Sequence, residues 1–183
     1  MDKEFFLQEL AKQSSMLYRV AFTILRNDHA CEDALQDTAL KAWEKRNSLR
    51  EPRYFRTWIT RICINACRDL QRQSGRILFL EDVTEPSVSP PDPDLALALA
   101  ALPENLRLPL VLCYSEGMTY AEIATALRLP VATVRGRIHR AKKELRKELD
   151  ESPVHESDCL QSPSAACHAG KRRGGPRKEL DAE

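Results

Sequence analysis

The sequence predicts an all-α protein with two small helical domains, a proline-rich linker between them and a C-terminal tail without helical patterning. Only 6 of the 183 residues are glycine, and apolar residues recur three and four positions apart, the spacing of one helix face. The stretch EDVTEPSVSPPDPD at residues 81–94 combines acidic residues with prolines, which neither continue a helix nor bury apolar surface. The domains are therefore expected at residues 1–75 and 95–150, the linker at residues 76–94 and a disordered tail at residues 151–183.

The N-terminal domain is predicted to contain three or four packed helices. Apolar spacing from Leu17 to Leu25 predicts one helix that ends at a turn-forming pair, and Asp28 is the expected N-cap of the next helix. A further helix is predicted from Phe55 to near Ser74. The middle helix carries a continuous stripe expected to be buried: Cys31, Ala34, Leu35, Thr38, Ala39, Ala42 and Trp43.

The second domain contains clear start and stop signals. Pro103 suits a first helical turn, and Pro109 is expected to kink or restart the helix because it lacks a backbone N–H. Gly117 is a natural C-cap. Thr119 and Glu122 form a capping box, in which each side chain bonds the backbone N–H of the other residue.

Two short helices follow the capping box and meet at Pro130. The first has Tyr120, Ile123, Ala124 and Leu127 on one face, and the connection is too short for anything but a helix-turn-helix. The second helix is predicted to turn these residues inward: Val131, Val134, Ile138, Ala141, Leu145 and Leu149.

The second helix of this motif is locally basic although the whole chain has a formal net charge of only +1. Residues 130–150 hold seven Arg and Lys residues against three acidic ones. A helix fits the major groove of DNA, where residues near its N-terminus reach base edges while Arg and Lys neutralise phosphates. A solvated surface helix is the alternative interpretation. The candidates for DNA contact are Thr133, Arg135, Gly136, Arg137, Arg140 and Lys143.

Three stretches of the chain resemble the extracytoplasmic-function sigma factors of bacterial RNA polymerase. LPENLRLPLVLCYSEGMTYAEIATALRLPVATVRGRIHRAKKEL resembles their C-terminal, promoter-binding domain. YRVAFTILRNDHACEDALQDTALKAWEK resembles the region that binds core polymerase, and FRTWITRICINACRDLQRQ resembles the segment that recognises and melts the −10 element. The resemblance covers about residues 1–150, and it departs at Gly136, where family members commonly carry Ser.

The resemblance assigns a role to two polar faces of the N-terminal domain. An acidic and amphipathic face is implied to dock on core polymerase and comprises Asp33, Gln36, Asp37, Leu40 and Lys41. A polar stripe at helical spacing is implied to hold the −10 strand and comprises Arg61, Asn65, Arg68 and Arg72. Phe55 and Trp58, on the same helix, are expected in the core rather than stacked on bases.

The implied function is that of a sigma factor that directs core RNA polymerase to promoters and assists −10 opening, with no catalytic chemistry and no cofactor. The implied partners are core polymerase, promoter DNA and an anti-sigma factor. The longest apolar run, LALALAAL at residues 95–102, is far short of the roughly 20 residues that a membrane span needs, so we expect no membrane insertion. A cytoplasmic location is expected because the six cysteines are widely spread and no secretory leader is evident at MDKEFF.

Two rival functions remain open at this stage. One is a polymerase-independent transcriptional regulator that uses the same helix-turn-helix and dimerises through the N-terminal domain. The other is an all-α nucleotide hydrolase in which Glu32, Asp33 and Asp37 ligate magnesium, since carboxylates four residues apart share a helix face.

The six cysteines do not form a compact disulfide framework, and a reducing compartment is the simpler interpretation. Cys63 and Cys67 lie four residues apart, but no further ligand is evident near them, so burial in the core is favoured. The tail has ligand types that suit zinc or copper, and the resemblance allows a metal or redox sensor there, although no metal site is assigned. These residues are His155, Cys159, Cys167 and His168.

Overall fold

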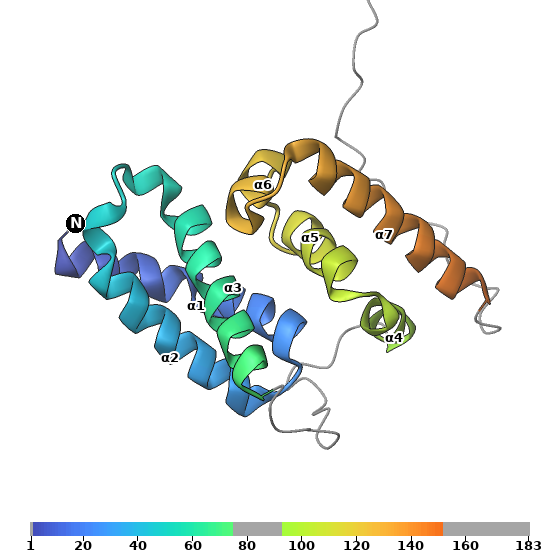
Figure 1. The fold of residues 1–183 in the computed structure, drawn as a ribbon, viewed down its shortest axis with the longest axis horizontal. Coiled ribbons are helices and arrows are strands. Elements are labelled where there is room, and N and C mark those ends of the chain that lie inside the picture. The colour runs from blue at the N-terminus through green and yellow to red at the C-terminus, as the bar shows by residue number, and fades with distance from the viewer. Residues whose placement is uncertain (1, 75–92, 152–183) are drawn as a thin grey trace, which may run out of the picture. The chain divides into compact units, whose positions relative to one another are not determined.

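The computed structural model describes residues 2–74 and 93–151, all of which belong to one compact unit, residues 1–152 (Figure 1). Across these two ranges the chain forms helices and no strand, as predicted. The expected linker, except for its last two residues, and all but the first residue of the expected tail lie outside the described residues. No helix in the described ranges is long and apolar enough to cross a membrane. The elements are α1 (Lys3–Leu25), α2 (Asp28–Glu44), the 3-10 turns η1 (Arg46–Ser48) and η2 (Pro52–Tyr54), α3 (Phe55–Ser74), α4 (Pro93–Ala101), α5 (Glu104–Tyr114), α6 (Tyr120–Leu127) and α7 (Val131–Glu151).

Helices α1, α2 and α3 pack against one another around an apolar core. Phe6 lies edge-on to Trp43 and to Phe55, with ring centroids 5.3 and 6.0 Å apart. Phe55 and Trp58 are 1% and 7% exposed, which confirms that both belong to the core. Burial of one such side chain contributes about 1.5–3 kcal/mol, so this cluster fixes how α3 lies on α1 and α2.

Two predictions for the N-terminal helices were wrong in detail. Helix α1 begins at Lys3, well before Leu17, because buried Phe6 extends the apolar face of that helix toward the N-terminus. The N-cap of α2 is Asn27 rather than Asp28: Asn27 has an extended backbone, and its Oδ1 accepts a hydrogen bond from Ala30 N at 2.9 Å. Asp28 is already helical and accepts a hydrogen bond from the Tyr18 hydroxyl.

Helices α5 and α6 pack on α7, and the predicted capping box is present. Thr119 N donates to Glu122 Oε2 at 2.8 Å, and Glu122 N donates to Thr119 Oγ1 at 3.3 Å. Glu122 is held as an acceptor by both groups of Thr119, which keeps the pKa of its carboxyl below the ordinary value. The start of α6 is therefore fixed by local bonds, as the sequence indicated.

The C-terminal helices differ from expectation at several positions. Pro109 lies inside α5, which continues without a break, because its buried leucine neighbours compensate for one missing hydrogen bond. Gly117 has a left-handed φ of +61° and turns the chain, but the C-cap position itself is Ser115. Val131 and Leu149 are 42% and 38% exposed instead of buried, because the 21-residue α7 extends past the shorter helices that cover its middle.

Candidate nucleic-acid and protein interfaces

The basic face of α7 is open, while the opposite face is packed. Val134, Ile138 and Ala141 are buried against α5 and α6, which holds the helix in a fixed rotation. Among the predicted DNA contacts, Thr133 and Arg137 are half-buried, whereas the other four are exposed: Arg135, Gly136, Arg140 and Lys143. None of these cations forms an ion pair with another described residue. Their charge therefore remains available to an anionic partner.

The connection between α6 and α7 is a tight turn. Arg128 has a left-handed backbone at the C-cap of α6, and Leu129 N donates to Ala124 O at 3.0 Å. Val134 N then bonds Pro130 O at 3.1 Å, so α7 begins directly after the proline. An added Cβ at Gly136 would meet no atom within 4 Å, so the site has room for a side chain such as the family's Ser.

The polar stripe on α3 differs from α7 because carboxylates already engage part of it. Arg72 pairs with Asp69 on the same helix, and Arg68 lies 3.8 Å from Glu104 of α5. The hydrogen bond from Arg72, with the nearby Lys41 ammonium, holds the pKa of the Asp69 carboxyl below its ordinary value. Sequence reasoning missed both carboxylates, although the three-residue spacing of Asp69 and Arg72 is itself a pairing signal.

The remaining members of the stripe are accessible. Asn65 is exposed and Arg61 half-buried, whereas the neighbouring Ile62, Cys63 and Ala66 are buried in the core. An open hollow on this side of the helix is lined by Asn65, Arg68, Gln71, Arg72 and Glu104. The predicted −10 residues therefore lie along one surface of α3, and the carboxylate of Glu104 on α5 lies beside them.

The predicted polymerase-binding residues share the outer face of α2. Asp33 and Gln36 are exposed, and Leu40 is 64% exposed, an uncommon state for a leucine surrounded by charges. Lys41 lies between two carboxylates, 3.3 Å from Asp37 and 3.5 Å from Asp69 of α3. This face is amphipathic and unoccupied by the other described helices, which suits a protein partner.

The cysteines of α2 and α3 are core residues, as predicted. Cys31, Cys63 and Cys67 are buried, and burial raises the pKa of the Cys31 thiol to about 12. Hydrogen bonds from Cys67 and Thr38 lower the pKa of Cys63, while the same Cys63–Cys67 contact raises that of Cys67. Over residues 2–74 and 93–151, no group of three or more His, Cys, Asp or Glu side chains is placed to hold a metal. The tail candidates lie outside these ranges.

Comparison with known proteins connects both helical groups to one family. The profile of Sigma-70 region 2 matches residues 11–77, and that of Sigma-70, region 4 matches residues 94–145. SigE, an ECF RNA polymerase sigma factor of Mycolicibacterium smegmatis, is 34% identical over 169 residues, covering 84% of this chain and 64% of SigE. The ECF RNA polymerase sigma-E factor of Salmonella typhimurium is 30% identical over 135 residues, covering 62% of this chain and 70% of that protein.

A solved structure agrees with these relatives. The sigma factor RpoE of Bartonella quintana, crystallised with the anti-sigma factor NepR, superposes with a TM-score of 0.70 at 26% identity, covering 80% of this chain and 97% of RpoE. The fold and the two matched regions define a sigma-70-type transcription initiation factor. Within that class, the chain belongs to the ECF sigma factors, as its sequence indicated. The matches do not favour the regulator or hydrolase alternatives.

Proposed function

We propose that this chain directs bacterial core RNA polymerase to promoters through residues 95–150, which bind the −35 element, and residues 1–75, which bind polymerase and the −10 element. The observation that carries the proposal is the open basic face of α7, which belongs to a capped helix-turn-helix. The same chain also contains a region that matches Sigma-70 region 2. No chemical step is assigned to any residue. The chain contributes only binding free energy, without a cofactor.

At the −35 element, α7 enters the major groove with its N-terminal half toward the bases. Thr133 and Arg137 lie at the edge of the packed face, where their side chains are partly held and suited to base contact. Arg135, Arg140 and Lys143 are exposed and neutralise phosphates, releasing counterions. Base contacts set the sequence preference, and phosphate contacts set the register.

At the −10 element, Arg61, Asn65, Arg68 and Arg72 of α3 follow the backbone of the non-template strand. Opening a duplex costs a few kcal/mol per unstacked step, so strand capture has to offset that cost. Core polymerase docks on the face of α2, where Leu40 supplies apolar contact. Asp33, Gln36 and Asp37 there accept charge-assisted or amide hydrogen bonds.

Regulation and location follow from the same comparison. RpoE was crystallised with an anti-sigma factor, and we propose that an anti-sigma protein likewise controls this chain. A transcription factor that acts on the chromosome works in the cytoplasm of a bacterium. This proposal assigns no metal to the candidate residues of the tail, which are His155, Cys159, Cys167 and His168.

The test is in vitro transcription of fragmented genomic DNA by purified bacterial core polymerase, with and without the full chain, followed by sequencing of new 5′ ends. Discrete new starts that share two upstream motifs are expected. Asp33→Ala should reduce starts and polymerase association together, while the control Glu4→Ala, an exposed acid on α1, should change neither. Binding to an inverted repeat without polymerase, and no new starts, would support the regulator instead.

A further inference from the structure

Gly136 lies on the outermost line of α7, opposite the face that packs on α5 and α6. Successive residues of a helix turn by about 100°, so a position two residues from both Val134 and Ile138 points away from them. Val134 and Ile138 are 0% and 2% exposed, whereas Gly136 is exposed. A partner that reaches the basic face of α7 therefore meets the bare backbone at Gly136.

Nothing within the described part of the chain requires a glycine at this position. Gly117 has a left-handed φ of +61°, but Gly136 has an ordinary helical backbone. A Cβ added to Gly136 would meet no atom within 4 Å, so close packing does not require glycine either. Glycine in an exposed helix interior also lowers stability relative to alanine. Any use for the missing side chain therefore lies in a molecule that contacts α7 from outside.

The open space where the Cβ of residue 136 would lie is called the notch here. Side chains on a helix tilt toward its N-terminus, so a side chain at position 136 would cover the residues one turn earlier, Ala132 and Thr133. Ala132 is exposed and Thr133 is half-buried. The notch therefore presents mainly carbon, from the Cα of Gly136 and from the methyl-bearing side chains of Ala132 and Thr133.

Cations flank the notch on both sides. Arg135 and Arg137 project about 100° to either side of Gly136, and Arg140 lies one turn further along the helix. None of these three arginines forms an ion pair with another described residue. In the proposed function Arg135 and Arg140 bind phosphates and Arg137 contacts a base, so the notch between them faces base edges in the major groove.

The chemistry of the base edges decides which group suits a carbon-lined notch. Guanine, adenine and cytosine present hydrogen-bond donors and acceptors in the major groove, while thymine adds a 5-methyl group to its O4 acceptor. A polar base atom set against carbon loses its hydrogen bond to water without replacement, whereas a methyl group gains by leaving water. The notch therefore favours thymine over the other three bases.

We propose that Gly136 is a specificity-determining residue, because the notch that it leaves on α7 receives the 5-methyl group of a thymine in the −35 element. The inference rests on the proposed function, in which α7 lies in the major groove. A serine, which members of the family commonly carry at this position, would put a hydroxyl into the notch and remove the methyl contact. The preference for thymine is therefore expected to depend on glycine at position 136.

The test begins with duplexes selected from a randomised pool by the immobilised full chain, and the selected motif should contain a fixed thymine. Each thymine of the motif is then replaced by deoxyuridine, which lacks only the methyl group, and affinity is measured by fluorescence anisotropy. One replacement should weaken binding about fourfold, the effect expected for burial of one methyl group. Gly136→Ser should bind the same two duplexes equally. Circular dichroism should show that this variant is at least as stable, since serine is a better helix former than glycine.

Glu144→Ser is the matched control, because it places the same side chain at another exposed position of α7, outside the proposed DNA contacts. It should leave the fourfold ratio between the two duplexes unchanged. A selected motif without thymine, or affinities that no deoxyuridine changes, would overturn the inference, and so would a fourfold loss that persists in Gly136→Ser. Neither selection nor binding needs polymerase. A negative transcription test together with a glycine-dependent methyl effect would therefore overturn the proposed function and leave the methyl contact standing.

Discussion

Helices α7 and α3 both present arginines on an exposed face, but among the described residues carboxylates engage two arginines of the α3 stripe and none of the predicted α7 contacts. The predicted contacts of α7 have no ion pair with any described residue, whereas Arg72 of α3 pairs with Asp69 and Arg68 faces Glu104. DNA that binds α7 displaces only water and counterions, but DNA that binds α3 must also displace carboxylates. Under the proposed function, −35 binding by α7 would require no displacement of a described carboxylate, whereas −10 binding by α3 would.

The largest predicted difference between α7 and α3 is in the salt dependence of their DNA affinity. If Arg135, Arg137, Arg140 and Lys143 neutralise four phosphates, affinity for a −35 duplex should fall about 100-fold between about 50 and 200 mM salt. The affinity for single-stranded −10 DNA, which makes about two effective phosphate contacts, should fall only about sevenfold over the same range of salt. Fluorescence anisotropy of the full chain on each DNA measures both slopes. Equal slopes would remove the distinction drawn between α3 and α7.

The Arg137→Ala substitution tests the α7 side of the comparison more locally. Loss of a base-edge contact should weaken −35 binding by about 1–3 kcal/mol and relax sequence preference at one position. Association with core polymerase should remain unchanged, since Arg137 lies on α7 and the proposed polymerase-binding face lies on α2. Competition binding with mutated −35 duplexes measures the preference, and Lys12→Ala on α1 is the control. If polymerase association falls as well, the roles assigned to the two domains are wrong.

The difference between the helices was only partly predictable from sequence. The capping box at Thr119, Pro130 after the turn and the apolar spacing at Val134, Ile138 and Ala141 are local signals, so the helix-turn-helix and its basic face were foreseen. The pairing of Arg68 with Glu104 joins residues 36 positions apart in different helical groups, and no local pattern encodes it.

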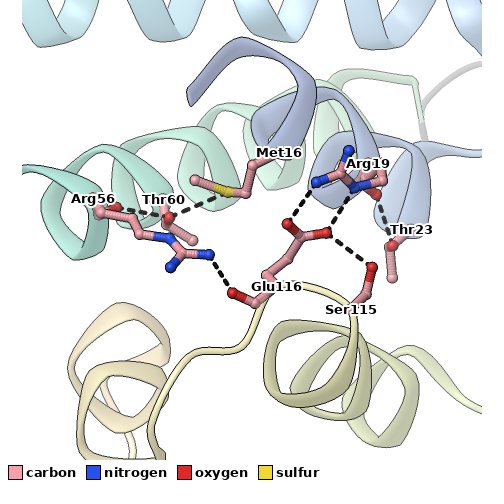
Figure 2. Close-up of polar contacts among 7 residues, drawn as sticks. All are labelled: Met16, Arg19, Thr23, Arg56, Thr60, Ser115 and Glu116. Atoms are coloured by element: carbon pink, nitrogen blue, oxygen red, sulfur yellow. Dashed lines mark hydrogen bonds and ion pairs between the residues drawn. The ribbon is translucent and has the colours of Figure 1, made fainter. Parts of the chain in front are cut away.

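The same limitation applies more strongly to the contact of Arg19 on α1 with Glu116, in the turn after α5 (Figure 2). Arg19 donates to both carboxylate oxygens of Glu116, each at 2.8 Å. The two residues are separated by 97 positions, and each looks like an ordinary surface charge in its own segment. Only packing of α5 on α1 makes Glu116 buried and gives it a partner. The start of α1 at Lys3 was missed for a related reason, because Phe6 gains its significance from Trp43 and Phe55, which lie far away in sequence.

The smallest predicted effect isolates the carboxylates of α3. Asp69→Asn removes the charge that faces Arg72 and Lys41, so single-stranded −10 DNA should bind about twofold more tightly, with no change for the −35 duplex. Because its partners lower the pKa of Asp69, the carboxyl remains charged as pH falls to its ordinary value of 3.8 and loses its charge only below that value. Binding measured between pH 8 and pH 5 should therefore show no pH dependence from titration of Asp69. Weaker −10 binding by Asp69→Asn would mean that Asp69 orients Arg72 for DNA instead of competing with it.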